Sequence, residues 1–323
     1  MAGDPRVAVV GATGAVGSQL VELISARGFS CRELKLFATQ RGASGTIESG
    51  GEQFLVHELE NPDALADFDI AFLALPQDPA AAIVAARPGP ILIDLSGAAR
   101  APSDAAPLVS PSLVPRERIG ELKGRGVFSV PHPAAHVLAT CLAAIEVRAG
   151  FVAATAMLGA SAGGRDRIAL MVDQTTDLLN ARLDLEDDET QRSFNVFMRE
   201  HERAVAAVIA SQAAALLRSE PELCLQAVTI PVLHGSALSI AIPRRTLPAD
   251  PIVRLRGAPG ILLVEDAEPL GIIDAVGQEA IFVRAEDTAA GLALWCTYDN
   301  ARLAALAALW VAETLTLATT SAN

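Results

Sequence analysis

The strongest chemical signal in the sequence is a glycine-rich segment that directly follows a short apolar run at residues 7–10. Gly11, Gly14 and Gly17 open a helical pattern at 18–26. Backbone N–H groups at the start of a helix, together with the helix dipole, bind phosphate groups. The spacing G-x-x-G-x-x-G is a variant of the dinucleotide-binding fingerprint, and a tight structural turn is the alternative interpretation. The predicted cofactor contacts here are Gly11, Thr13, Gly14, Ala15 and Val16.

The end of the next predicted strand, at residues 34–38, indicates which dinucleotide would bind. An acidic residue there would hold the ribose hydroxyls of NAD, and segment 37–41 contains none. Thr39 and Arg41 are placed to contact the cofactor, with Arg41 facing a 2′-phosphate, although a surface arginine is as often only solvated. The pattern favours NADP.

Three histidines have a spacing that suggests a metal site. His132 and His136 are four residues apart at a predicted helix start, and His234 is a possible third ligand. No carboxylate partner for a bound histidine is evident, so polar residues lining a pocket are the favoured interpretation. Cys141, farther along the same helix, is interpreted as a small buried apolar side chain.

Composition excludes several classes of protein. The 323 residues carry a net charge of −13 without a basic cluster, which argues against nucleic-acid binding. The cysteines at 31, 141, 224 and 296 are far apart and no secretory leader precedes the first strand, so we expect no disulfides and a cytoplasmic location. No apolar stretch is long enough to span a bilayer.

The periodicity of apolar residues divides the chain into two regions. In the first hundred residues, strands at 34–38, 70–75 and 91–95 alternate with helices, which predicts a parallel sheet. Later segments predict helices at 168–181 and 199–217, and strands at 151–157, 226–232, 237–242 and 280–285. We therefore expect an α/β protein: a Rossmann-type parallel-sheet domain (1–130 with the terminal helix, 300–323) and an α+β substrate and dimerisation domain with an antiparallel sheet (131–299).

Five motifs together carry a resemblance to the aspartate-semialdehyde dehydrogenase family. They are residues 11–17 (GATGAVG), 93–100 (IDLSGAAR), 161–164 (SAGG), 231–236 (PVLHGS) and 299–302 (DNAR). The resemblance implies an NADP-dependent enzyme that interconverts aspartyl phosphate and aspartate semialdehyde. It also implies a homodimer formed through residues 151–297, a small-molecule carboxylate substrate, cofactor contacts at Ser161 and Gly163, and a phosphate contact at Arg100, for which a surface ion pair is the alternative.

The catalytic residues that this resemblance implies are replaced in the sequence. The family's nucleophilic cysteine falls on His132 or Pro133, its glutamine on Leu158, its substrate-binding arginine on Thr229 and its histidine on Ser236. Three functions remain open. The first is a catalytically lost paralogue, similar to the Usg proteins, that keeps NADP binding. The second is an active NADP-dependent oxidoreductase acting by direct hydride transfer on a related small carbonyl or acyl substrate, and the third is a semialdehyde dehydrogenase with an unrecognised nucleophile.

Overall fold

The protein is described here from a computed structural model that covers residues 4–38, 45–98, 106–122, 124, 126–182, 184–185, 190–217 and 219–320. The chain folds as two compact units. The first comprises Met1–His132 and Ala304–Asn323, and the second comprises Pro133–Leu303. Among the described helices, none combines the length and the apolar character needed to cross a bilayer.

The first unit contains a seven-stranded sheet in the order β3-β4-β2-β1-β5-β6-β7. All neighbouring strands are parallel except β3 and β4, which form an antiparallel pair at one edge. The strands are β1 Arg6–Val10, β2 Glu33–Ala38, β3 Thr46–Ser49, β4 Glu52–Glu58, β5 Ile70–Leu73, β6 Ile91–Asp94 and β7 Val127–Ser129. The parallel sheet was predicted from the sequence. Strands β3 and β4 were not predicted, because their residues are mostly polar and exposed.

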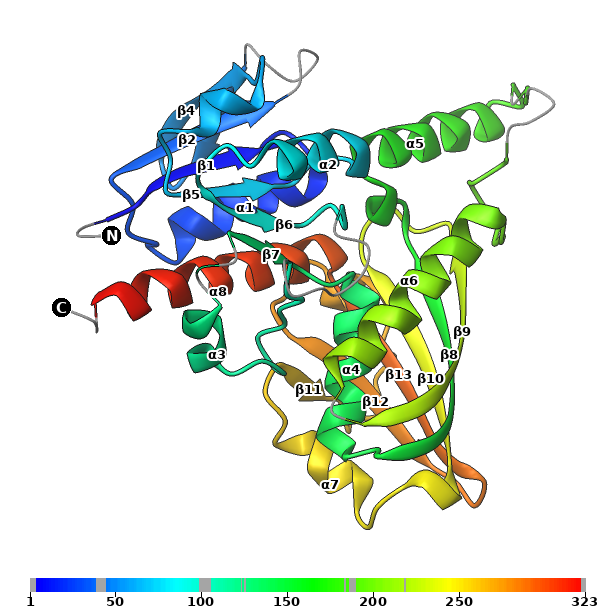
Figure 1. Cartoon of the computed structure of the whole chain (residues 1–323). Coiled ribbons are helices and arrows are strands. Elements are labelled where there is room, and N and C mark those ends of the chain that lie inside the picture. Colours follow the sequence, from blue (N-terminus) through cyan, green and yellow to red (C-terminus); the bar gives the residue numbers. More distant parts are fainter. Residues whose placement is uncertain are drawn as a thin grey trace. The chain divides into compact units, whose positions relative to one another are not determined.

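Helices cover both faces of this sheet, as they do in Rossmann-type domains (Figure 1). Alternate residues of β1 point to opposite faces, so that Val9 packs in one core with Leu20 of α1 and Ala308 of α8. Val10 packs in the other core, with Ile83 of α2. The helices of this unit are α1 Ala15–Ala26, η1 Pro62–Leu65, α2 Gln77–Ala86, α3 Arg116–Glu121 and the later part of α8 Asn300–Thr320.

The second unit contains a six-stranded sheet in the order β11-β12-β13-β10-β8-β9. The strands are β8 Ala149–Leu158, β9 Glu220–Thr229, β10 Ser236–Pro243, β11 Ile261–Leu263, β12 Ile281–Asp287 and β13 Gly291–Tyr298. The prediction of an antiparallel sheet is wrong for two pairs, since β8 pairs with β9 and β11 with β12 in parallel. Helices α5 and α6 lie between β8 and β9 in the chain, and such a crossover lets the two strands run in the same direction.

Described helices cover one face of this sheet, whereas the alternate side chains on the other face of β8 are half-buried or exposed. The helices of the unit are α4 Pro133–Ile145, η3 Ala160–Gly163, α5 Arg165–Leu179, α6 Glu200–Leu216, η4 Arg244–Thr246, α7 Pro251–Arg256 and η5 Ile273–Ala275. Helix α4 contacts β10 and α6 contacts β9. In β8, Val152 and Ala156 are buried, whereas the alternate residues Thr155 and Met157 are only half-buried. We call this second side the open face; on β8, β9 and β10 it includes Phe151, Ala153, Thr155, Met157, Glu222, Cys224, Gln226, Val228, Ser239, Ala241 and Pro243.

Candidate functional site

The glycine-rich turn between β1 and α1 has a geometry that only glycine permits at two positions. Gly11 has φ +89°, and a Cβ there would lie 2.3 Å from the carbonyl oxygen of Ala74. A Cβ on Gly17 would lie 2.0 Å from the carbonyl oxygen of Gly11. The amides of Gly11 and Ala12 donate hydrogen bonds to the carbonyl oxygen of Phe37, at 2.8 and 3.0 Å. The turn is thereby fixed against the end of β2.

The N-terminus of α1 is suited to an anion. Gly14 is its N-cap residue, and within this fully described helix there is neither a side-chain cap nor an acidic residue in the first turn. Thr13, Gly14, Ala15 and Val16 are partly exposed, so a ligand can approach the first-turn amides. These residues fit the pyrophosphate of a dinucleotide. The other predicted contacts in this unit, Thr39, Arg41 and Arg100, lie outside the described residues.

In the second unit, strand pairing brings three of the predicted catalytic positions together. Thr229 on β9 pairs with Leu158 on β8, and Leu158 pairs with Ser236 on β10. Ser236 in turn pairs with Tyr298 on β13. We call these four residues, at one end of the sheet, the cross-strand row. Leu158, Ser236 and Tyr298 are all buried, and Tyr298 is the only tyrosine of the chain.

A buried carboxylate that the sequence did not reveal lies at one end of this row. Glu202, in the first turn of α6, is only 4 % exposed and accepts a hydrogen bond of 2.9 Å from the Thr229 hydroxyl. It also accepts one of 2.9 Å from the Arg199 amide. Burial alone would raise the pKa of Glu202, but these hydrogen bonds outweigh it and lower that pKa. Glu202 is therefore an anion next to Thr229.

Ser236 of the row is hydrogen-bonded to the start of α8. Asp299 caps this helix, because its carboxylate accepts a 3.0 Å hydrogen bond from the Arg302 amide. The next residue, Asn300, accepts hydrogen bonds from the hydroxyls of Ser161, at 2.8 Å, and of Ser236, at 3.5 Å. Ser161 and Gly163, the predicted cofactor contacts of this unit, belong to η3. Asn300 lies in one of the five motifs, but no function was predicted for it.

The position of the nucleophile falls where the chain passes from one unit to the other. His132 is the last residue of the first segment, and Pro133 is the first residue of α4. Burial lowers the pKa of His132 and of His136 to about 4 in each case, so both imidazoles are neutral at pH 7. His234 is exposed, and the described residues contain no group of three ligands suited to a metal ion.

Comparison with known proteins identifies the family. Residues 6–121 match the family described as semialdehyde dehydrogenase, NAD binding domain. A USG-1 protein homolog of Azotobacter vinelandii is 32 % identical over 96 % of this chain and 97 % of its own length. The chain belongs to the aspartate-semialdehyde dehydrogenase family. Within this family it is close to the USG-1 type.

Solved structures of the family have the same fold. Aspartate semialdehyde dehydrogenase II from Vibrio cholerae, solved in complex with ASA, has a TM-score of 0.85 and 26 % identity, over 98 % of this chain and 99 % of that one. A probable aspartate-semialdehyde dehydrogenase from Pseudomonas aeruginosa has a TM-score of 0.84 and 29 % identity, over 97 % and 99 %. The first unit is therefore a Rossmann-type domain of a family that binds a nicotinamide cofactor, and the second is its α/β partner domain.

Proposed function

We propose that this protein binds NADP(H) through its first unit and does not carry out the thiol-dependent reaction of aspartate-semialdehyde dehydrogenases. The observation that carries the proposal is the contrast between the glycine turn, which fits a dinucleotide, and the cross-strand row. In the row, Leu158 is apolar, and the hydroxyls of Thr229 and Ser236 are hydrogen-bonded to Glu202 and Asn300. When bound, the cofactor would supply a hydride donor or acceptor. The chain's own residues at the row would supply neither a thiolate nor an imidazole.

The side chains at the four catalytic positions support the loss of thiol chemistry. At the nucleophile position, Pro133 has no nucleophilic atom and the imidazole of His132 would give only a short-lived acyl-imidazole, whereas Leu158 has no hydrogen-bonding group to steady an intermediate. The Ser236 hydroxyl donates to Asn300, and it has no basic nitrogen that could take up a proton. The thiols of Cys141 and Cys296 are fully buried, and the hydrogen-bonding contact with Cys141, together with burial, raises the pKa of Cys296. A buried protonated thiol is a poor nucleophile.

The charge beside Thr229 supports a change in the ligand as well. An arginine at this position would attract a substrate carboxylate, whereas Thr229 is neutral and its hydroxyl is held by Glu202. Because Glu202 is ionised, it repels a carboxylate that approaches this end of the row. A small dicarboxylate-like substrate is therefore disfavoured here.

A fluorescence titration with NADPH and NADH tests cofactor binding. Arg41 follows the second strand, and segment 37–41 contains no acidic residue. NADPH should therefore bind at least about tenfold more tightly than NADH. Arg41→Ala should remove the difference. Equal affinities in the unmodified protein would contradict the assignment of NADP, and absence of binding to both would contradict the proposal. If the protein oxidises NADPH with a small carbonyl compound in the absence of phosphate, the proposal of a lost activity would be replaced by that of an oxidoreductase acting by direct hydride transfer.

We also propose that the protein is a homodimer in which two open faces meet. The open-face residues of β8 and β10 are uncharged, Phe151 is 39 % exposed, and Glu222 on β9 is the charged residue opposite it. Because the chain carries a net charge of −13, a contact between two copies is least unfavourable where charged side chains are few, and the β8–β10 part of this face meets that condition. Small side chains such as Ala153 and Ala241 let two sheets approach to about 10 Å around a two-fold axis.

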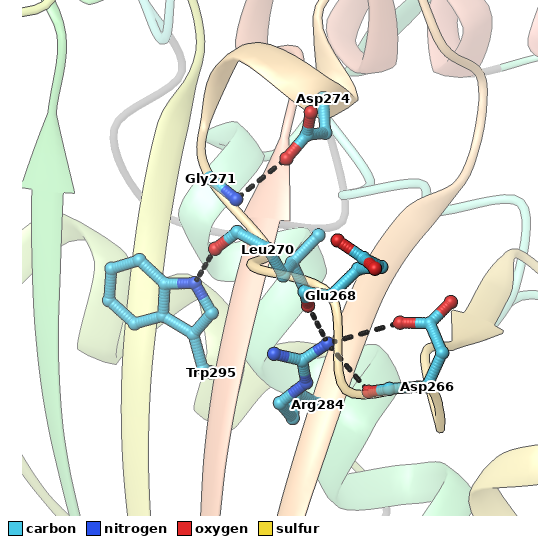
Figure 2. A network of polar contacts seen from close by, with 7 residues as sticks. All are labelled: Asp266, Glu268, Leu270, Gly271, Asp274, Arg284 and Trp295. Carbon is cyan, nitrogen blue, oxygen red and sulfur yellow. Dashed lines mark hydrogen bonds and ion pairs between the residues drawn. The ribbon is translucent and has the colours of Figure 1, made fainter.

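A loop defines where this contact surface ends. Arg284 and Trp295 are cross-strand neighbours on the same side of β12 and β13. The Arg284 guanidinium donates to the carbonyl oxygens of Asp266 and Glu268, and the Trp295 indole donates to that of Leu270 at 2.9 Å (Figure 2). The carboxylate of Asp274 fixes the Gly271 amide at 2.7 Å. The loop thus covers Arg284 and Trp295, whereas Glu286 and Ala293, the next pair on this side of β12 and β13, are exposed.

Sedimentation of two matched variants tests the dimer. Ala241→Arg places a charge on the open face and should convert the dimer to a monomer, whereas Ala207→Arg, on an exposed position of α6, should leave it intact. Cys224 serves as a natural reporter, since it is exposed in the single chain and should react with a maleimide only after the dimer dissociates. A monomeric unmodified protein, or rapid labelling of Cys224 in the dimer, would contradict this interface.

A further inference from the structure

Two cysteines meet inside the helix-covered side of the second unit. The sulfur atoms of Cys141 on α4 and Cys296 on β13 are 3.9 Å apart, and both residues are fully buried. They are 155 positions apart in the sequence, so only the fold brings them together. The other two cysteines differ, because Cys224 is exposed and Cys31 is partly buried. Cys141 and Cys296 therefore form the thiol pair best placed to react internally.

The two elements that carry this pair have a particular place in the chain. The chain passes between the units twice, at His132–Pro133 and at Leu303–Ala304. Helix α4 is the first element after the first passage, and β13 is the last strand before the second passage. A covalent bond between α4 and β13 would thus join the helix that follows the first passage to the strand that precedes α8, in which the second passage lies.

We propose that Cys141 and Cys296 form a reversible disulfide when the protein meets a peroxide, and that this bond fastens α4 to β13. One thiolate attacks the peroxide, its O–O bond breaks, and a sulfenic acid and water result. The second thiol then attacks the sulfenic sulfur, which forms the S–S bond and releases a second water. Both sulfurs are oxidised and the peroxide is reduced. A disulfide of small thiols, reduced in turn by the two cysteines, would reach the same product.

The surroundings of the pair explain why the two thiols would be oxidised slowly and would stay reduced under reducing conditions. The thiolate is the attacking species. Both sulfurs are shielded from the solvent, and the contact with Cys141, together with burial, raises the pKa of Cys296. Oxidation therefore requires transient opening between α4 and β13, and it should be slower than that of Cys224 in the dissociated chain, where Cys224 is exposed. In intracellular proteins such pairs are more often regulatory than structural.

The test uses the full chain with Cys31→Ser and Cys224→Ser, which leaves only the proposed pair. After hydrogen peroxide treatment, intact mass should fall by two hydrogens, and peptide mapping should show a Cys141–Cys296 link within one chain. The melting temperature should rise by about 5 °C or more, because the link closes a long loop, and dithiothreitol should reverse the rise. Adding Cys296→Ala should abolish both effects.

Three results would overturn the proposal. The first is a folded protein whose two thiols remain reduced, even when treated within about 10 °C of its melting temperature, where opening is frequent. The second is oxidation of Cys141 or Cys296 to a sulfinic acid without a link, which would mean that the sulfurs do not reach each other. The third is a link between two chains, seen as a dimer on a non-reducing gel.

Discussion

The glycine turn of the first unit and the cross-strand row of the second unit differ in what their backbones and side chains offer. In the turn, the backbone presents partly exposed amides, and two glycines are required because a Cβ would collide with a carbonyl oxygen. In the row, the chemistry would depend on side chains. At the predicted catalytic positions these are Thr229, Leu158 and Ser236. A backbone site is maintained by the fold itself, whereas a side-chain site changes with each substitution.

The contrast explains how one chain keeps a family fold while one of its two sites changes. Replacing Gly17 would disturb β1, α1 and the core around them, so stability constrains this residue as well as binding. The positions of Leu158 and Ser236 need only buried side chains that pair across strands, and many residues meet that need. Our account therefore predicts a bound cofactor without the family's covalent chemistry.

The largest effect should come from Gly17→Ala. Its new methyl group would lie 2.0 Å from the carbonyl oxygen of Gly11, so the turn must shift, and NADPH affinity should fall by about 100-fold or more. The matched control is Gly45→Ala in the same unit, where an added Cβ meets nothing within 4 Å. NADPH titration of both variants measures the effect. Unchanged affinity in Gly17→Ala would show that the dinucleotide binds elsewhere.

Substitutions in the cross-strand row should leave cofactor binding almost unchanged. Because Leu158 and Ser236 are assigned no contact with the dinucleotide, Ser236→Ala and Leu158→Met should change the NADPH affinity by less than about twofold, or 0.4 kcal/mol. Isothermal titration calorimetry can resolve this difference from the effect in the glycine turn. A tenfold loss in either variant would mean that the row takes part in cofactor binding.

The sequence predicted the glycine turn because its residues are contiguous and their roles are local. It could not predict that Thr229, Leu158 and Ser236 align, because that depends on pairing between strands far apart in the chain. Glu202 was missed for a different reason. A glutamate in the first turn of a helix is usually a solvated capping residue, and its burial depends on β9 packing against α6.

Two errors in the predicted fold have similar causes. Strand β13 was not predicted, because a short, mostly apolar run such as Gly291–Tyr298 has no periodicity that separates strand from helix. The parallel pairing of β8 with β9 was not predicted, because periodicity indicates which side chains are buried but not the direction of the neighbouring strand. Both features depend on long-range contacts.

A smaller effect should appear in the dependence of stability on pH. His136 is 8 % exposed, and burial lowers its pKa from 6.5 to about 4, so the unfolded chain binds a proton more readily than the folded protein. The contribution of neutral His136 to the free energy of unfolding is therefore fully present above pH 6.5. About 3 kcal/mol of this contribution should be lost as the pH drops to 4.

Denaturant unfolding of His136→Gln measures this contribution. The variant should lose part of the decrease in stability between pH 6.5 and 4. The same pH dependence in His136→Gln and in the unmodified protein would show that the imidazole is not buried in its neutral form.

Cofactor binding without thiol-dependent turnover is tested most directly when both are measured in one sample of the unmodified protein. NADPH binding is followed by fluorescence, and NADPH formation is then followed after adding aspartate semialdehyde, phosphate and NADP⁺, with and without a thiol-alkylating agent. Our account predicts saturable NADPH binding and no phosphate-dependent formation of NADPH under either condition. Phosphate-dependent turnover that alkylation abolishes would contradict it, because a cysteine would then serve as the nucleophile despite the replaced positions.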